Sequence, residues 1–193
     1  MTLAPGAGTT MENPLLVSLA EALADRGNAV MRFNFVYHER SQKRPDPQKK
    51  LLETTRAAAN FLAQQCPGKK LVLAGKSMGG RMASLAVAGG YTSSGLVFLG
   101  YPLHPPGKPE KMRDGHLKNI PCPMLFIQGT RDPLCDLELL SPVISSLGGR
   151  AAVHKIEGGD HSFEVRKRDN RTPESVLTEI VNAIDGWLHA HVL

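Results

Sequence analysis

The chain has 193 residues, of which 41% are hydrophobic and 21% are charged, and its formal net charge is +5. This length and composition are typical of one soluble globular domain with a full hydrophobic core. No apolar run approaches the roughly 20 residues of a membrane span, and the first residues do not form a secretory signal. We therefore expect a single domain over residues 1–193, located in the cytoplasm and binding no membrane.

Six apolar segments alternate with segments of helical periodicity. Strands are predicted at residues 2–4, 29–35, 70–74, 95–100, 124–128 and 151–156. Helices are predicted between and after them, at residues 14–26, 47–66, 82–88, 137–147 and 173–188, with an interruption or restart at Pro142. Three of these helices start with a polar residue and a proline, the pattern of an N-cap and first helical position: Asn13-Pro14, Asp46-Pro47 and Thr172-Pro173. The alternation predicts a three-layer α/β/α sandwich with a mostly parallel sheet, whose ligands gather at the carboxyl ends of the strands.

Cysteine and basic residues exclude two classes of site. The three cysteines, Cys66, Cys122 and Cys135, are odd in number and match no zinc pattern, so we expect reduced thiols and no metal. The densest basic stretch, residues 38–50, has one aromatic residue near it and no recognisable binding module. A solvated loop that runs into a helix is therefore expected there, and no contact with nucleic acid.

The segment Gly75-Lys76-Ser77-Met78-Gly79 matches G-x-S-x-G, the nucleophile elbow. It follows an apolar strand and precedes an apolar helix, which is the context that this motif requires. A sharp turn between the two exposes the central serine, and the glycines allow neighbouring backbone to approach it. Ser77 is therefore the candidate nucleophile.

Two other interpretations of this segment must be weighed. Gly75-Lys76-Ser77 also ends the phosphate-binding pattern G-x-x-x-x-G-K-[ST], but position 70 is lysine where that pattern needs glycine. The residues between are strand-like, so a nucleotide site is disfavoured. A small-residue turn with no chemistry is the second alternative.

A serine nucleophile needs a base, and the base needs an acid that holds its tautomer. One large class of serine hydrolases carries them in the order Ser, Asp or Glu, His. Asp132 and His161 follow Ser77 in that order, each in a glycine-bearing turn directly after a predicted strand. They are the candidate acid and base.

Other residues compete for these roles. Asp136 is predicted to cap the next helix, Asp160 to form a turn, and His154 to be a structural residue inside the last strand. Cys135 has no base after it in a nucleophile-like turn, so it is predicted to be a packed thiol.

An oxyanion needs two N–H donors. The Met78 N–H, at the start of a helix, is the first candidate, and Ala7, in the loop Pro5-Gly6-Ala7-Gly8 after the first strand, is the second. An ordinary glycine turn is the alternative for that loop.

Five motifs spread over the chain resemble the α/β-hydrolase superfamily, and more narrowly the small dienelactone-hydrolase-like group that includes the KANL/Tex hydrolase-like proteins. They are the segments at residues 3–8, 32–35, 75–81, 100–104 and 158–163. The resemblance implies hydrolase-like activity with Ser77 as nucleophile, Asp132 as acid and His161 as base. Some relatives in this group are non-catalytic parts of larger assemblies.

The resemblance also has one departure. Members of the family usually have one or two strands before the loop at residues 3–8, whereas this chain begins almost at the loop. The strand at 29–35 is then expected to form an exposed edge, covered by loop residues 36–47 or by a second copy in a homo-oligomer. The segment 101–121 is too short for a cap domain, and Tyr101, Leu103 and His104 are candidate substrate-pocket residues.

These features together predict a lidless serine hydrolase that acts on a small ester or thioester through an acyl-enzyme intermediate. No metal or organic cofactor is expected. The alternative is a pseudohydrolase, a binding or scaffold protein on the same fold.

Overall fold

The computed structural model describes residues 1–193 and contains one six-stranded, wholly parallel sheet. Its strands are β1 (Thr2–Ala4), β2 (Met31–Arg32), β3 (Val72–Lys76), β4 (Gly95–Leu99), β5 (Met124–Gly129) and β6 (Ala151–Ile156). They lie in the order β2-β1-β3-β4-β5-β6, which places β3, the strand before Ser77, inside the sheet. Every residue of β3, β4 and β5 is buried, as expected for parallel strands covered on both faces.

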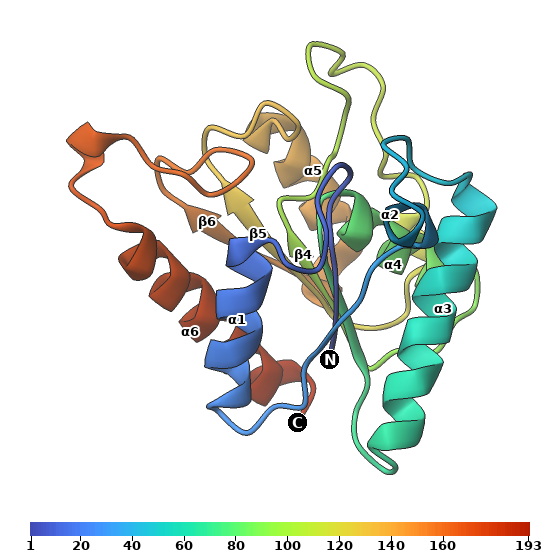
Figure 1. Cartoon of the computed structure of the whole chain (residues 1–193). Coiled ribbons are helices and arrows are strands. Elements are labelled where there is room, and N and C mark those ends of the chain that lie inside the picture. Colours follow the sequence, from blue (N-terminus) through green and yellow to red (C-terminus); the bar gives the residue numbers. More distant parts are fainter.

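Helices cover both faces of the sheet, so the α/β/α sandwich is confirmed (Figure 1). The α-helices are α1 (Pro14–Ala24), α2 (Val36–Glu39), α3 (Gln48–Gln65), α4 (Met78–Ala88), α5 (Leu137–Leu147) and α6 (Pro173–His191). Short 3₁₀ turns form at Leu117–Asn119, Gly148–Arg150 and Lys167–Asp169. Helices α1 and α6 lie together on one face, and α3, α4 and α5 lie on the other. No helix has both the length and the hydropathy to cross a membrane.

Two of the three predicted helix starts are confirmed. Asn13 accepts a hydrogen bond from the Leu15 N–H, and the Thr172 hydroxyl accepts one from the Ser175 N–H. The third prediction was wrong in detail. Helix α3 begins at Gln48 without a side-chain cap, and the Asp46 carboxylate instead accepts from the Tyr37 N–H and pairs with Lys50.

The interruption expected at Pro142 is absent, because α5 runs through it without a break. Proline removes one backbone donor from a helix, which leaves one carbonyl without its partner. The proline lies on the exposed side of α5, where water can satisfy that carbonyl.

The strand expected at 29–35 is shorter than predicted. Only Met31 and Arg32 pair with β1, and residues 36–39, expected as loop, form the short helix α2. The edge position itself is confirmed, since β2 has a neighbour on one side only. A homo-oligomer formed through this edge stays a prediction.

Candidate active site

Ser77, Asp132, His161 and Ala7 all follow carboxyl ends of strands. Ser77 comes directly after β3, Ala7 follows β1, Asp132 follows β5, and His161 follows β6. Since all six strands are parallel, these four loops lie along the same edge of the sheet. The sheet topology therefore brings the predicted residues to one rim.

The backbone of Ser77 adopts a strained conformation. Its φ is 49° and its ψ is −112°, a combination that a side chain with a Cβ rarely takes and that costs about 1–3 kcal/mol. The Ser77 N–H donates to the Leu99 carbonyl oxygen of β4 at 3.0 Å, which holds the turn against the neighbouring strand. Ser77 keeps part of its surface exposed, whereas Lys76 before it is buried. These are the features of a nucleophile elbow.

The glycines of the elbow are required by close backbone packing. A Cβ on Gly79 would lie 2.6 Å from the carbonyl oxygens of Ala4 and Pro5, and one on Gly75 would lie 2.5 Å from the Gly80 nitrogen. These neighbours are backbone atoms, which cannot move aside as a flexible side chain can.

Gly79→Ala should therefore destabilise the fold by about 3 kcal/mol or more, since overpacking a tight core costs about 1–3 kcal/mol even where side chains can adjust. Gly186→Ala is the matched control, because Gly186 lies within α6 and its Cβ would meet nothing within 4 Å. That control should gain about 1 kcal/mol from helix propensity. Urea unfolding of the two variants measures both changes, and equal stabilities would contradict the packing explanation.

His161 and Asp132 form a hydrogen-bonded pair. The distance from His161 Nδ1 to Asp132 Oδ2 is 2.7 Å; the carboxylate is fully buried and the imidazole is 24% exposed. Asp132 also accepts from Gln128 Nε2 at 2.6 Å and from the Leu134 N–H at 2.8 Å. Three donors thus fix the orientation of this carboxylate, and the carboxylate fixes the imidazole with its Nε2 free for chemistry.

Sequence reasoning missed Gln128. Its side chain is fully buried and links Asp132 to the turn after β4, because its Oε1 accepts a hydrogen bond from the Tyr101 N–H at 2.9 Å. The available signal was a polar residue at the end of an otherwise apolar strand, four residues before the candidate acid.

The serine and the histidine both lie against the end of β4. No hydrogen bond joins the Ser77 hydroxyl to the imidazole in this structure. The last residue of β4, Leu99, binds the Ser77 N–H, and a Cβ on the next residue, Gly100, would lie 3.4 Å from His161 Nδ1. Without a substrate such contacts are often long, and they close in the substrate complex.

Both candidate oxyanion donors lie beside the serine. A Cβ on Gly6 would lie 3.6 Å from Ser77 Cβ, so the loop after β1 packs against the elbow. Ala7 is an exposed residue whose N–H donates no hydrogen bond within the protein. Met78 is the first residue of α4, where N–H groups have no partner inside the helix. The two donors are therefore available to a ligand.

Lys76 is the second residue that sequence reasoning missed. Its side chain is 8% exposed, and its ammonium group donates a hydrogen bond to the His161 carbonyl oxygen. Burial lowers the pKa of Lys76 to about 8, although the nearby carboxylates of Asp132 and Asp160 raise it. A P-loop lysine must be free to reach phosphates, whereas Lys76 is buried and bonded to His161. The phosphate-binding alternative is therefore disfavoured.

Comparison with known proteins bears on the fold and the family. The sequence matches the family described as alpha/beta hydrolase domain over residues 1–189. The chain belongs to the α/β hydrolases.

Solved structures share the fold of this α/β hydrolase at low sequence identity. An α/β serine hydrolase without a lid from Xanthomonas campestris is 22% identical, with a TM-score of 0.73 over 98% of this chain and 81% of that one. An α/β serine hydrolase homologue from Coxiella burnetii is 20% identical, with a TM-score of 0.72 over 94% and 81%. A Pyrococcus furiosus esterase is 16% identical, with a TM-score of 0.74 over 100% and 82%.

The competing residues of this α/β hydrolase have the structural roles expected of them. Asp136 caps α5 through the Glu138 N–H, and Asp160 closes its own turn by accepting from the N–H groups of Ser162 and Glu164. His154 pairs with Glu179 at 2.9 Å. Burial, followed by the charges of Asp132 and Asp136, raises the pKa of Cys135 to about 12, so this thiol is inert.

The three predicted pocket residues lie beneath the rim of the site. Tyr101 and Leu103 are 0% exposed and His104 is 5% exposed. The Tyr101 hydroxyl donates to the Arg113 carbonyl oxygen, and His104 Nε2 accepts from the Asp136 N–H at the start of α5. These side chains are buried inside the protein, and none presents a surface to a substrate in this conformation. Proline content indicates an irregular segment but does not indicate which of its side chains turn inward.

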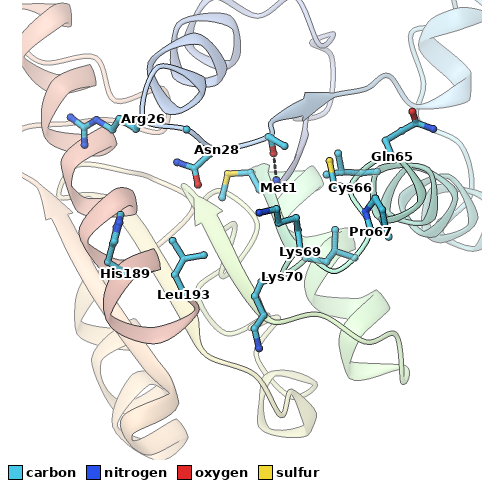
Figure 2. Close-up of a pocket in the computed structure, with 15 residues that line it drawn as sticks. Met1, Arg26, Asn28, Gln65, Cys66, Pro67, Lys69, Lys70, His189 and Leu193 are labelled. Carbon is cyan, nitrogen blue, oxygen red and sulfur yellow. Dashed lines mark hydrogen bonds between the residues drawn. The ribbon is translucent and has the colours of Figure 1, made fainter.

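Two cavities lie away from Ser77. One of about 520 Å³ is at the opposite end of the sheet, beside residues that precede β1 and β3, and Figure 2 shows Met1, Cys66, Lys69 and Lys70 around it. The other, of about 580 Å³, lies between α1, α6 and the turn after His161, and its lining includes Leu15, Phe163 and Leu177. The second is close in the chain to the candidate base.

Proposed function

We propose that this α/β hydrolase is a serine hydrolase that cleaves small esters or thioesters through an acyl-enzyme intermediate. The observation that carries the proposal is the strained, part-exposed Ser77 at the same sheet edge as a bonded histidine–aspartate pair. Strained backbone persists where the surrounding structure enforces it, and a serine raised on such a turn is suited to attack. Esterase structures among the neighbours support the reaction class.

In the first half of the proposed reaction, His161 Nε2 takes the proton of the Ser77 hydroxyl while Oγ attacks the carbonyl carbon. The carbonyl electron pair moves to oxygen, and the N–H groups of Ala7 and Met78 hold that oxyanion. Asp132 accepts the hydrogen bond from Nδ1–H, which stays on the imidazole, and its charge stabilises the imidazolium. The oxyanion then re-forms the carbonyl, the bond from carbon to the leaving oxygen or sulfur breaks, and the imidazolium protonates that atom. An alcohol or thiol departs, and the acyl group stays on Ser77.

In the second half, water takes the place of the alcohol. His161 removes one proton from the water, the resulting oxygen attacks the acyl carbon, and the oxyanion forms between the same two donors. Collapse returns the proton from Nε2 to Ser77 and releases the carboxylic acid. The cycle needs no metal or organic cofactor.

The pseudohydrolase is the second candidate, and the missing hydrogen bond between Ser77 and His161 favours it. A fluorophosphonate probe separates the two functions, because it reacts with an activated serine and spares an unactivated one. We expect one covalent adduct, mapped by peptide mass to Ser77 and lost when the protein is unfolded first. A folded wild-type protein that stays unlabelled would support the binding role and reject the hydrolase.

A further inference from the structure

Lys76 places a charge inside the core, one residue before the nucleophile. Side chains alternate along β3, so Val72, Ala74 and Lys76 point to the face that α1 and α6 cover. Val72 and Ala74 belong to the hydrophobic cluster of that face. An ammonium group in such surroundings is unfavourable unless its contacts compensate for lost water.

The contacts of this ammonium group all belong to the turn that carries His161. It donates to the His161 carbonyl oxygen, and it lies 5.5 Å from the centre of the Phe163 ring, a distance suited to a cation–π interaction. It forms no ion pair within 4.0 Å. The usual role of a buried lysine, partner to a buried carboxylate, therefore does not explain it.

Because Gly100 has no side chain, it leaves room for the Lys76 ammonium group to reach the turn that carries His161. A Cβ there would lie 3.1 Å from Lys76 Nζ and 3.3 Å from the His161 carbonyl oxygen. Its φ of +66° also favours glycine. The end of β4 is thus shaped around the contact between the lysine and the histidine turn.

This contact spans strands that are not neighbours. Two strands, β4 and β5, separate β3 from β6, so no backbone ladder connects the nucleophile strand with the strand that precedes the base. The hydrogen bond from Lys76 is a direct connection between the residue before Ser77 and the backbone of His161. A shift of the histidine turn by 1 Å would be enough to slow a reaction strongly.

We propose that Lys76 is a positioning residue, whose ammonium group holds the backbone of His161 and sets the separation of the imidazole from Ser77. This inference rests on the proposed hydrolase function.

Lys76→Met tests the proposal, because it keeps the apolar stem and removes the donor and the charge. With a p-nitrophenyl ester we expect kcat to fall about 10- to 100-fold with KM changed less than about twofold, as for a misplaced base. Lys76→Arg, which keeps a charged donor, should restore part of kcat.

Lys155→Met is the matched control, because Lys155 is exposed on β6, the strand that leads to the histidine turn. It should leave both kcat and KM unchanged. If Lys76→Met does not fold, Lys76→Gln replaces it: its amide is one bond shorter and uncharged, so it should show the same loss. A folded Lys76→Met or Lys76→Gln variant with wild-type kcat would overturn the positioning role. A wild-type protein with no esterase activity and no probe labelling would instead reject the hydrolase function itself.

Discussion

Ser77→Ala is expected to lower the hydrolysis of short p-nitrophenyl esters by about three or more orders of magnitude, which is typical when a serine nucleophile is removed. Its fold should be nearly unchanged. Alanine keeps a Cβ, so the backbone strain at φ 49° is the same before and after the substitution. The hydroxyl also makes no hydrogen bond to His161 whose loss would cost stability. Steady-state kinetics and urea unfolding, measured together, test both expectations.

The matched control is Ser84 of α4, which pairs with His116 at the start of the 3₁₀ turn Leu117–Asn119. Ser84 Oγ lies 2.7 Å from His116 Nε2, but Ser84 is 0% exposed and no substrate carbonyl can reach it. Burial, and then the charge of Arg81, lowers the pKa of His116 to about 4. Ser84→Ala should lose about 1 kcal/mol of stability with its hydrogen bonds and keep kcat. Full turnover in Ser77→Ala, or its loss in Ser84→Ala, would show that the nucleophile is misassigned.

Asp132→Asn is expected to lower kcat by about 10²- to 10⁴-fold. All three groups around this carboxylate are donors: His161 and Gln128 at Oδ2, and the Leu134 N–H at Oδ1. An asparagine must turn its NH₂ group toward one of them. Turning it toward Leu134 opposes one donor and turning it toward His161 opposes two, so the first orientation is favoured. The imidazole then keeps its tautomer but loses the negative charge that stabilises the imidazolium.

Asp136→Asn makes the same chemical change four residues later and serves as the control. Asparagine is as good an N-cap as aspartate, so α5 should keep its cap and kcat should stay within about twofold. The variants are compared by kcat/KM across the pH range. Equal activity of the two would remove Asp132 from the proposed reaction.

Local signals predicted the nucleophile turn and the positions of the acid and the base. Ser77 lies between a buried strand and an apolar helix that adjoin it in sequence, and Asp132 and His161 each follow a strand by a few residues. In a parallel sheet these local facts suffice, because all carboxyl ends meet at one edge. The helix starts at Pro14 and Pro173 were predictable for the same reason.

Features that depend on contacts across the fold were not predictable. The bond from Lys76 to His161 exists only because the turn after β6 folds back over β4 and β5, which no sequence spacing encodes. Whether Tyr101 points toward a ligand or into the core was decided by a partner twelve residues away, the Arg113 carbonyl. The interruption predicted at Pro142 was wrong, since a proline on the solvent-exposed side of a helix can be tolerated.

The pairing of β1 with β3 has a consequence for how the protein is made. Thr2 lies opposite Leu73, so about 70 further residues must be synthesised after β1 before its inner neighbour exists. At the usual synthesis rate of about 5–20 residues per second this delay is roughly 4 to 14 s. During that interval Leu3 and Ala4 lack the neighbouring strand beside which they are buried in the finished fold.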